Sequence, residues 1–545
     1  MYFTETFTPT EQQVLGRYFT NLDRPVFGLV NMPEVVKGAL FARYSRSPKS
    51  LRRLFLDEFL DDVGEATASD SSDDSANGRN VPSRAERLYD KVFVEYGDDS
   101  VAQLGGVHLA CEQASNILTK TLEWGRLASY LEQSTRYIAY DDQIGGRYRY
   151  YRDPELAASS LGQRYQNDMD HIFGEYAALV PVLLDHVRAT TPKVDGDSDF
   201  VYRNATKAKA LDAVRGMLPA AATSNVGIYG SGQAYEQLLL RMNADPLPEA
   251  RAYSQMMLEE LRKIIPSFVR RVDMADRGGA ISNYYDTNRQ GMSQLASELL
   301  SDAGPTSDST GAGVTLVDFD PRAEEKMVAS MLYPYTDRSE ADLEKQVATM
   351  SAEERTRVMR TYAGERSNRR QRPGRALERS FYRFDVLADY GAFRDLQRHR
   401  MATIEWQPLQ PGHGYVRPEL VDEAGVADRF DAVMERSAEL YHALVGKFPA
   451  QASYAVSLAY RLRFNINLNA RSAMHVLELR SQPQGHPAYR QVVQEMHNQI
   501  RDLAGHTATA AMMTFVDHAD ERALERLEAE RRAEQNRRVG AKNEK

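Results

Sequence analysis

The chain of 545 residues contains one cysteine, Cys111, and two tryptophans, Trp124 and Trp406. A single cysteine excludes an internal disulfide and a zinc site built on cysteines. No run of residues approaches the ~18 apolar side chains of a membrane span. The first residues, MYFTETFTPTEQQ, have neither the basic nor the apolar segment of a signal peptide, so we expect none. Together these absences predict a cytoplasmic protein.

The chain also lacks an excess of positive charge, because 68 Lys and Arg residues stand against 77 Asp and Glu residues, which gives a formal net charge of −9. This balance argues against a general nucleic-acid-binding protein, although it leaves room for a local basic pocket. Hydrophobic residues make up 42% of the chain, which is enough for substantial cores. At roughly 150 residues per domain, the length predicts three or four domains, or two large ones.

Two polar segments divide the chain. Residues 64–83 are rich in serine and aspartate and predict a mobile surface loop. Residues 301–313, SDAGPTSDSTGAG, predict a linker between two halves, 1–300 and 314–516. A charged helical tail is expected over 517–545. Elsewhere helical periodicity dominates and strand-like runs are few and short, so the sequence predicts a helix-rich α+β fold.

The first half carries an alternation of polar residues in EWGRLASYLEQSTRYIAY, residues 123–140. Glu132, Ser134 and Arg136 are two residues apart, which places them on one side of an extended segment. A hydroxyl beside a guanidinium suits an oxyanion such as phosphate. On the spacing alone, however, an exposed strand edge with ordinary polar alternation is the simpler interpretation.

The second half carries two basic segments. RHRMATIEWQPLQP, residues 398–411, opens with three adjacent cations and then becomes apolar. NLNARSAMHVLELRS, residues 467–481, predicts a helix on which Arg471 and His475 are neighbours at i, i+4. The opposite face of that helix would pack into a core through Ala470, Ala473, Met474 and Leu477. A helix with a solvated basic face is again the simpler interpretation of this pattern by itself.

These segments resemble the two signature motifs of the flavin-dependent thymidylate synthases, the ThyX family. In the family's Arg-His-Arg motif, the second half keeps the three opening cations but has Trp406 and Pro408 where the family has Glu and Ser. The first half loses that opening and instead keeps Arg126, Ser129, Glu132, Ser134, Arg136 and Tyr137.

The family's second motif, Arg-x-x-Leu-Pro followed by Asn-Ala-Arg, divides in the same manner. The first half keeps RGMLP with Arg215, whereas Ser453 occupies the equivalent position in the second half. The second half keeps the Asn-Ala-Arg helix. The losses are therefore complementary. The resemblance implies two tandem ThyX-like domains, helix-rich around small antiparallel sheets, that form a pseudo-dimer with one hybrid site assembled from both halves.

The resemblance further implies an activity, the reductive methylation of dUMP to dTMP, with FAD as cofactor and methylenetetrahydrofolate and NADPH as co-substrates. It assigns residues to each ligand and no metal. For dUMP these are Glu132, Ser134, Arg136 and Arg215. For FAD they are Arg398, His399, Arg400, Asn469, Arg471, His475 and, by a looser match, Glu378. The catalytic residues it implies are Arg480, facing the uracil ring, and Arg398.

No protein nucleophile is required by this chemistry, and we interpret Cys111 as a buried packing residue in a helical run, VHLACEQASNIL. The two tryptophans lie at signature positions, where they either stack on a ligand ring or plug a lost half-site. Family members resemble homotetramers, so we expect this fused chain to be a homodimer, with no nucleic-acid or membrane partner. Two alternatives remain open: a divergent flavin enzyme that alkylates another pyrimidine nucleotide, and a non-catalytic flavin- or nucleotide-binding protein.

Overall fold

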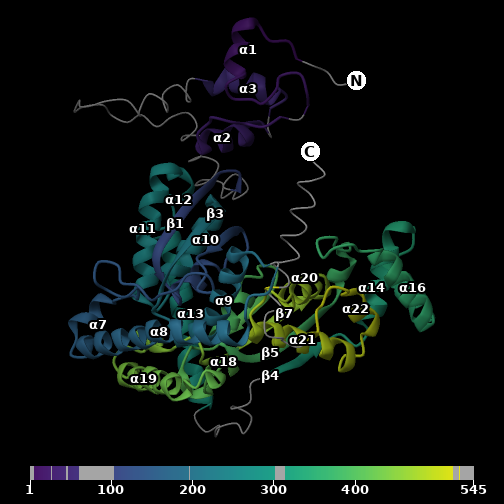
Figure 1. The fold of residues 1–545 in the computed structure, drawn as a ribbon. Coiled ribbons are helices and arrows are strands. Elements are labelled where there is room, and N and C mark those ends of the chain that lie inside the picture. Colours follow the sequence, from purple (N-terminus) through teal and green to yellow (C-terminus); the bar gives the residue numbers. More distant parts are fainter. Residues whose placement is uncertain are drawn as a thin grey trace, which may run out of the picture. The chain divides into compact units, whose positions relative to one another are not determined.

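The computed structural model describes residues 5–25, 27–44, 47–60, 103–195, 197–300, 313–519 and 527 (Figure 1). The predicted loop 64–83, the linker up to residue 312 and nearly all of the tail lie outside the described residues. The chain forms two compact units that interleave along the sequence. The first unit comprises Met1–Glu112, Thr121–Glu132 and Asn225–Asp302, and the second comprises Gln113–Lys120, Gln133–Ser224 and Ala303–Lys545.

The first unit is organised around a three-stranded sheet of order β1-β3-β2. Strand β2 runs antiparallel to β3, with Ala128 opposite Gly230 and Glu132 opposite Val226. The elements that build this unit, some of whose ends extend into the second, are α1 (Pro9–Leu15), α2 (Glu34–Tyr44), α3 (Leu51–Glu58), β1 (Gly106–Ser115), β2 (Ala128–Glu132), β3 (Thr223–Ser231), α10 (Gly232–Asn243), α11 (Pro248–Ile264), α12 (Pro266–Val269) and α13 (Gly278–Leu300).

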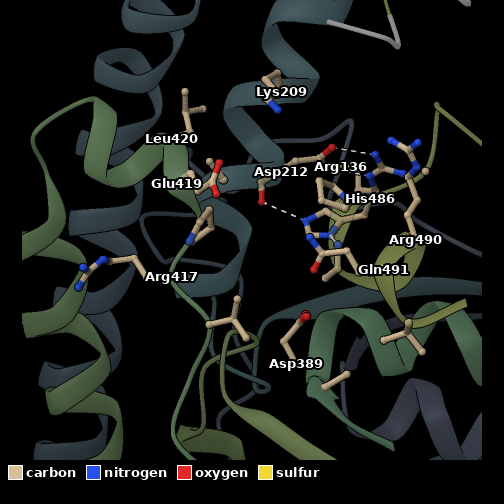
Figure 2. Close-up of a pocket in the computed structure, with 18 of the residues that line it drawn as sticks. Arg136, Lys209, Asp212, Asp389, Arg417, Glu419, Leu420, His486, Arg490 and Gln491 are labelled. Atoms are coloured by element: carbon tan, nitrogen blue, oxygen red, sulfur yellow. Dashed lines mark hydrogen bonds and ion pairs between the residues drawn. The ribbon is translucent and has the colours of Figure 1, made fainter. Parts of the chain in front are cut away.

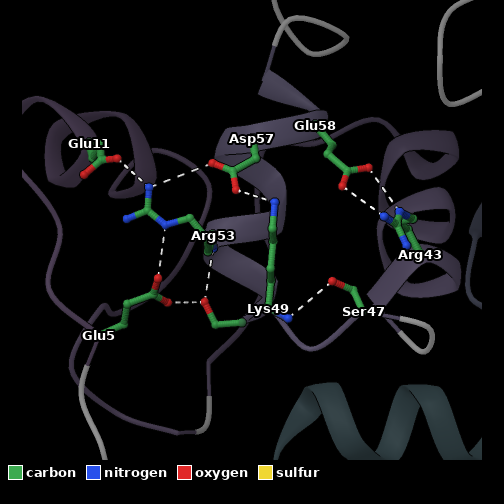
Figure 3. A network of polar contacts seen from close by, with 9 residues as sticks. Glu5, Glu11, Arg43, Ser47, Lys49, Arg53, Asp57 and Glu58 are labelled. Atoms are coloured by element: carbon green, nitrogen blue, oxygen red, sulfur yellow. Dashed lines mark hydrogen bonds and ion pairs between the residues drawn. The ribbon is translucent and has the colours of Figure 1, made fainter.

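Ion pairs connect the three N-terminal helices of this unit (Figure 3). Arg53 on α3 donates to Glu5 at 3.1 Å and to Glu11 at 2.6 Å. Arg43 on α2 donates to Glu58 on α3 at 3.1 and 3.2 Å. These side chains are partly exposed, and such pairs contribute specificity of packing more than free energy.

The second unit is organised around a four-stranded antiparallel sheet of order β4-β5-β7-β6. In its central pair, Phe381 is opposite Asn469 and Asp389 is opposite Arg461. The strands are β4 (Gly313–Phe319), β5 (Phe381–Asp389), β6 (Thr403–Trp406) and β7 (Arg461–Asn469). Strand β4 is the first element after the predicted linker.

Helices outnumber strands in this unit, as predicted. The α-helices are α6 (Leu118–Leu122, shared with the first unit), α7 (Pro154–Ala158), α8 (Gly162–Thr190), α9 (Asp199–Val214), α14 (Ala323–Leu332), α15 (Glu340–Ala348), α16 (Ala352–Ala363), α17 (Tyr390–Leu396), α18 (Glu419–Glu423), α19 (Ala427–Val445), α20 (Ala470–Arg480), α21 (Pro487–Asp502) and α22 (Thr507–Met512). Short 3-10 turns are η3 (Arg215–Met217), η4 (Tyr333–Tyr335), η5 (Arg375–Arg379), η6 (Pro411–His413) and η7 (Gln451–Ala455). Among the described helices, none is long and apolar enough to cross a membrane.

The same strand–helix module occurs in both halves of the sequence. Strands β3 and β7 each have nine residues and lead directly into α10 and α20. Ser231 caps α10 by accepting a hydrogen bond from Ala234 N, and Asn469 caps α20 by accepting one from Ser472 N. These capping side chains satisfy amide donors that the first helical turn leaves open. The helix predicted within 467–481 is confirmed, with Ala470, Ala473, Met474 and Leu477 buried.

Within the second unit, the segment that contains RGMLP pairs with its own counterpart from the other half. Ala220 N donates to Val456 O at 2.8 Å, and Leu458 N donates to Leu218 O at 2.9 Å. The bridge is antiparallel and centres on Pro219 opposite Ser457. The pairing is reciprocal. When Arg215 is aligned with Ser453, the donor Ala220 is equivalent to the donor Leu458, and the acceptor Leu218 is equivalent to the acceptor Val456. Such reciprocity is the property of a two-fold axis, here inside one chain.

Two local predictions were wrong. Cys111 lies in strand β1 instead of a helix, although it is buried as predicted. The alternation of Glu132, Ser134 and Arg136 does not describe one extended segment, because β2 ends at Glu132 and a turn follows it over 135–137. Backbone hydrogen bonds from Tyr137 N and Ile138 N to Ser134 O close this turn. The alternating pattern therefore spans the end of a strand and the turn that follows it.

Candidate functional site

Asp395, on α17 of the second unit, is surrounded by arginines from both halves of the sequence. Its carboxylate lies 3.4 Å from Nη1 of Arg480, 3.7 Å from Nη1 of Arg398 and 3.9 Å from Nη1 of Arg215. Burial opposes ionisation of Asp395, but the surrounding guanidinium groups outweigh it and hold the pKa of this carboxyl well below its usual range. Asp395 is thus a fixed negative charge between three cations.

His399 is held beside this group as a neutral ring. Nε of Arg480 donates to Nε2 of His399 at 2.9 Å, and the His475 ring lies edge-on with its centroid 5.6 Å from that of His399. Burial, followed by the charge of Arg480, lowers the pKa of His399 well below its ordinary value. Burial and nearby arginines also lower the pKa of His475, to about 4. Three of the predicted flavin-side or catalytic residues are therefore brought together.

Arg215 is almost completely buried beside the same carboxylate. Its Nη2 has no hydrogen-bond partner among the residues that the structure describes. The guanidinium lies over Gly391: a Cβ at that glycine would be 3.1 Å from Nη2 of Arg215 and 2.9 Å from Oδ1 of Asp389. Any larger residue at position 391 would crowd the arginine. Burial lowers the pKa of Arg215, which makes an anionic partner favourable at this position.

Arg136 forms a bidentate ion pair with Asp212 of α9. Nε and Nη2 donate to the two carboxylate oxygens, both at 2.7 Å. Nη1 donates to Gln484 O and to the hydroxyl of Tyr489, both at 3.1 Å. Arg136 therefore directs four of its five N–H groups at the protein. Although burial disfavours the charge, the pair with Asp212 raises the pKa of Arg136 above its ordinary value.

This ion pair lies in the wall of a cavity of about 840 Å³ in the second unit (Figure 2). Lys209 and Asp212 approach the cavity from α9, and Arg490 and Gln491 from the start of α21. His486 donates from Nε2 to Asp212 O at 3.3 Å, while its Nδ1 accepts from Ala488 N. Burial, followed by the charge of Arg215, lowers the pKa of His486 to about 3. The imidazole is neutral, with its proton on Nε2.

The other predicted flavin-side residues form a second set of contacts. Arg471 donates from Nε to Pro373 O at 3.0 Å and from Nη1 to Glu378 Oε1 at 3.2 Å. The side chain of Asn469 accepts from Ser472 N at 2.7 Å and caps α20. Arg400 is exposed. The structure thus pairs Arg471 with Glu378 and gives Asn469 a role in the helix start.

The remaining predicted nucleotide-side residues divide between the two units. Ser134 lies in the second unit, where its hydroxyl accepts from Arg136 N at 3.3 Å. Glu132 is buried at the end of β2 in the first unit. Of the tryptophans, Trp406 packs its ring 5.3 Å from that of Phe393, and Trp124 lies 5.4 Å from the guanidinium carbon of Arg241.

Sequence reasoning missed four residues of this cluster: Asp212, Asp395, His486 and Tyr489. Both acids carry a signal that was available, because Asp212 and Asp395 each precede a motif arginine by three residues, in DAVR and DLQR. The aromatic residues His486 and Tyr489 have no such local pattern. Among the described residues, no group of three or more His, Cys, Asp or Glu side chains is placed to hold a metal ion.

A duplicated helix-rich α+β fold with arginines clustered at the junction of the copies defines a class of protein, and comparison with known proteins gives its family. The model of the Thy1 family, described as thymidylate synthase complementing protein, matches residues 54–267 and again 315–504. The chain belongs to this family. The two matches confirm the tandem organisation and the ThyX-like resemblance of the sequence.

Curated relatives extend over nearly the whole chain. A UPF0159 protein of Chlamydia muridarum is 38% identical over 528 residues, covering 96% of this chain and 98% of the relative. A UPF0159 protein of Chlamydia pneumoniae is 37% identical over 518 residues, covering 95% and 96% respectively. The tandem arrangement is thus shared with proteins of the same length.

Solved structures resemble parts of the chain more remotely. The UMP/dUMP methylase PolB from Streptomyces cacaoi, bound with 5-Br dUMP, has 18% identity and a TM-score of 0.30, covering 38% of this chain and 98% of that one. The flavin-dependent thymidylate synthase ThyX from Helicobacter pylori, in complex with FAD and dUMP, has 15% identity and a TM-score of 0.26, covering 34% and 92%.

Proposed function

We propose that the protein is a flavin-dependent thymidylate synthase that methylates dUMP to dTMP, with FAD as cofactor and methylenetetrahydrofolate and NADPH as co-substrates. The observation that carries the proposal is the convergence on Asp395 of Arg215 from the first half and Arg398 and Arg480 from the second. Each half has lost part of the motifs, and one retained arginine of the first half meets two of the second at Asp395. This is the arrangement expected of one hybrid site.

The donor set suits an anionic nucleotide and a dinucleotide cofactor. Arg215 offers a buried N–H that lacks a partner among the described residues. Arg480 contacts the other carboxylate oxygen of Asp395, the one that Arg215 does not face. A fixed cation next to a uracil ring favours negative charge that develops on the ring. FAD would supply the hydride and methylene transfer chemistry when bound. Arg398, which is partly exposed, and Arg400, which is exposed, are cations suited to its pyrophosphate.

Among the dUMP residues, we assign two roles. Arg215 contacts the nucleotide directly, together with Ser134 of the same unit. Arg136 reaches the phosphate only through its last Nη2–H, because its other donors hold Asp212, Gln484 and Tyr489. Arg136 therefore serves mainly to position the loop before α21. Neutral His399 orients Arg480 through its Nε2 acceptor.

The activity is tested with purified protein, dUMP, methylenetetrahydrofolate, NADPH and FAD, with dTMP measured by chromatography and each component omitted in turn. We expect no dTMP when the protein, dUMP, methylenetetrahydrofolate or NADPH is omitted. FAD that copurifies with the protein would sustain the reaction without added FAD, and it should appear among the molecules released when the protein is denatured. If the protein methylates UMP but not dUMP, it is instead an enzyme that alkylates another pyrimidine nucleotide. A protein that binds neither FAD nor dUMP at micromolar concentration contradicts the hybrid site.

Two variants separate the sides of the site. Arg215→Lys keeps the charge but loses the planar fork, and we expect about a 10- to 100-fold weaker affinity for dUMP with FAD binding unchanged. Arg400→Ala should weaken FAD binding about tenfold and leave dUMP binding unchanged. Arg262→Ala, which removes an exposed arginine paired with Asp273, is the control and should alter neither. If both variants lost affinity for dUMP and for FAD equally, the substitutions would have disturbed the fold, and neither arginine would have a specific binding role.

A further inference from the structure

Helix α13 exposes apolar side chains along most of its length. Its start packs against the rest of the first unit: Gly278 is buried, and the hydroxyl of Ser282 donates to Leu240 O at 3.1 Å. From Thr287 to Leu300 every residue is exposed. A free helical segment of this length is marginally stable in water, and an apolar stripe on it calls for a partner surface.

The exposed stripe has the spacing of a coiled-coil seam. Successive members are separated alternately by four and three residues: Ile281, Tyr285, Asn288, Met292, Leu295 and Leu299. All six are exposed, with Met292 at 63% and Leu299 at 69%. No charged residue interrupts the seam, so it selects neither an acidic nor a basic partner. A regular 3.5-residue period is the pattern of a helix that pairs with another helix of the same period.

A second copy of the same helix complements this seam. In a parallel pair each seam residue meets its own copy, and Asn288 then meets the partner's Asn288, so that their amides hydrogen-bond. The spacing places Asn288 at a d position, and a polar residue in an otherwise apolar seam favours the register in which it meets a polar partner. Tyr284, which flanks the seam, faces the partner's Arg289 at a position suited to a cation–π contact.

The area available is also suitable. Seven large apolar side chains on α13 are exposed by 42% or more, counting Tyr284 and Leu300 with the five apolar seam residues. At about 200 Å² for a large side chain, they offer on the order of 700 Å², close to the ~800 Å² per partner of a standard interface. We propose that two copies of this chain associate through α13 as a parallel helix pair.

Light scattering of the full chain without ligands tests the proposal independently of the enzymatic activity. The wild-type protein should have twice the mass of one chain. Met292→Glu/Leu295→Glu, which places four carboxylates in the paired seam, should halve that mass and raise the dissociation constant at least 100-fold. Gln294→Glu, on the same exposed stretch but outside the seam, should remain dimeric.

Three results would overturn the proposal: a monomeric wild-type protein, a dimeric double variant, or dissociation of the Gln294→Glu control as well. A double variant that lowers the Tm without changing the mass would show that the chain covers the stripe itself. If the double variant does not fold, cross-linking decides. Asn288→Cys should form an inter-chain disulfide at least tenfold faster than Gln294→Cys, because only position 288 faces its own copy in the pair. Native Cys111 is buried and does not compete. Equal rates in the two variants would reject the pairing.

Discussion

Arg480 donates from Nε to Nε2 of His399 over 2.9 Å, and this contact defines the protonation of the imidazole. An arginine Nε only donates, so Nε2 of His399 is the acceptor and the neutral ring carries its proton on Nδ1. A protonated His399 would place a third cation against Arg480 and Arg398. The site therefore depends on histidines that remain neutral, and this has a measurable consequence.

The first prediction concerns acid stability. Burial lowers the pKa of His486 to about 3, below the ~6.5 of an unfolded chain. The unfolded state then binds a proton that the folded state does not, so the stabilisation from His486 is complete above pH ~6.5 and decreases as the pH falls toward 3. At pH 5 the loss is at most about 2 kcal/mol for this group. Urea unfolding at pH 7.5 and 5.0 measures it.

His486→Gln is the matching variant, because an amide keeps a donor for Asp212 O and an acceptor for Ala488 N. We expect the difference in unfolding free energy between the two pH values to shrink in this variant. His171→Gln, at an exposed position of α8, is the control and should leave the difference unchanged. A pH dependence that is identical in all three proteins would refute this assignment to His486.

The second prediction concerns the carboxylate between the arginines. Asp395→Asn removes the negative charge that Arg215, Arg398 and Arg480 share. We expect a loss of about 3 kcal/mol in the free energy of unfolding, because these arginines lose a common counter-ion at a partly buried site. Asp273→Asn, at an exposed ion pair, should cost no more than about 1 kcal/mol. Equal effects in the two variants would show that Asp395 is not an electrostatic centre.

The third prediction separates stability from binding at Arg136. Removing Arg136 alone leaves Asp212 buried without its partner, so Arg136→Ala should lose about 3 to 5 kcal/mol of stability. Arg136→Ala/Asp212→Ala removes both charges and should be more stable than the single variant. Arg429→Ala, which breaks an exposed pair with Glu175, is the control. A double variant whose loss equals the sum of the two single losses would argue against the coupling.

The fourth prediction concerns Cys111. Burial raises the pKa of its thiol to about 12, so the reactive thiolate is scarce at neutral pH. We expect the folded protein to resist iodoacetamide at pH 8, where the urea-unfolded chain is alkylated at least tenfold faster. Cys111→Ala should retain the proposed activity. Inactivation by this substitution in a variant that still folds would point to a thiol in the reaction.

The sequence predicted well those features that repeat at short range. The 3.6-residue pattern after Asn469 predicts α20, and the structure contains that helix. A period-two signal was also present around Cys111, where Val107 and Cys111 are buried on one face of β1, but an apolar run in a helix-rich chain was interpreted as a helix. Gln113, with φ of 57°, interrupts the regular strand there and weakens its pattern.

The site was predictable only in part. Motif arginines were found from the resemblance to the family's signature motifs, whereas their counter-ions were not, because Asp212 and Asp395 acquire their roles through tertiary contacts with Arg136 and Arg480. Likewise, no local pattern shows that four N–H groups of Arg136 are already engaged by the protein. That saturation follows from the approach of Gln484 and Tyr489, which lie about 350 residues away along the chain.

The reciprocal pairing of the RGMLP segment with SYAVS has a genetic consequence. In an assembly of identical subunits, every substitution appears on both sides of a two-fold axis, so a damaging change has no intact copy to compensate for it. Here both sides of the axis belong to one polypeptide, and a mutation changes one side only. Arg215 stands where its counterpart is Ser453, so the two sides of this axis already differ at a motif position.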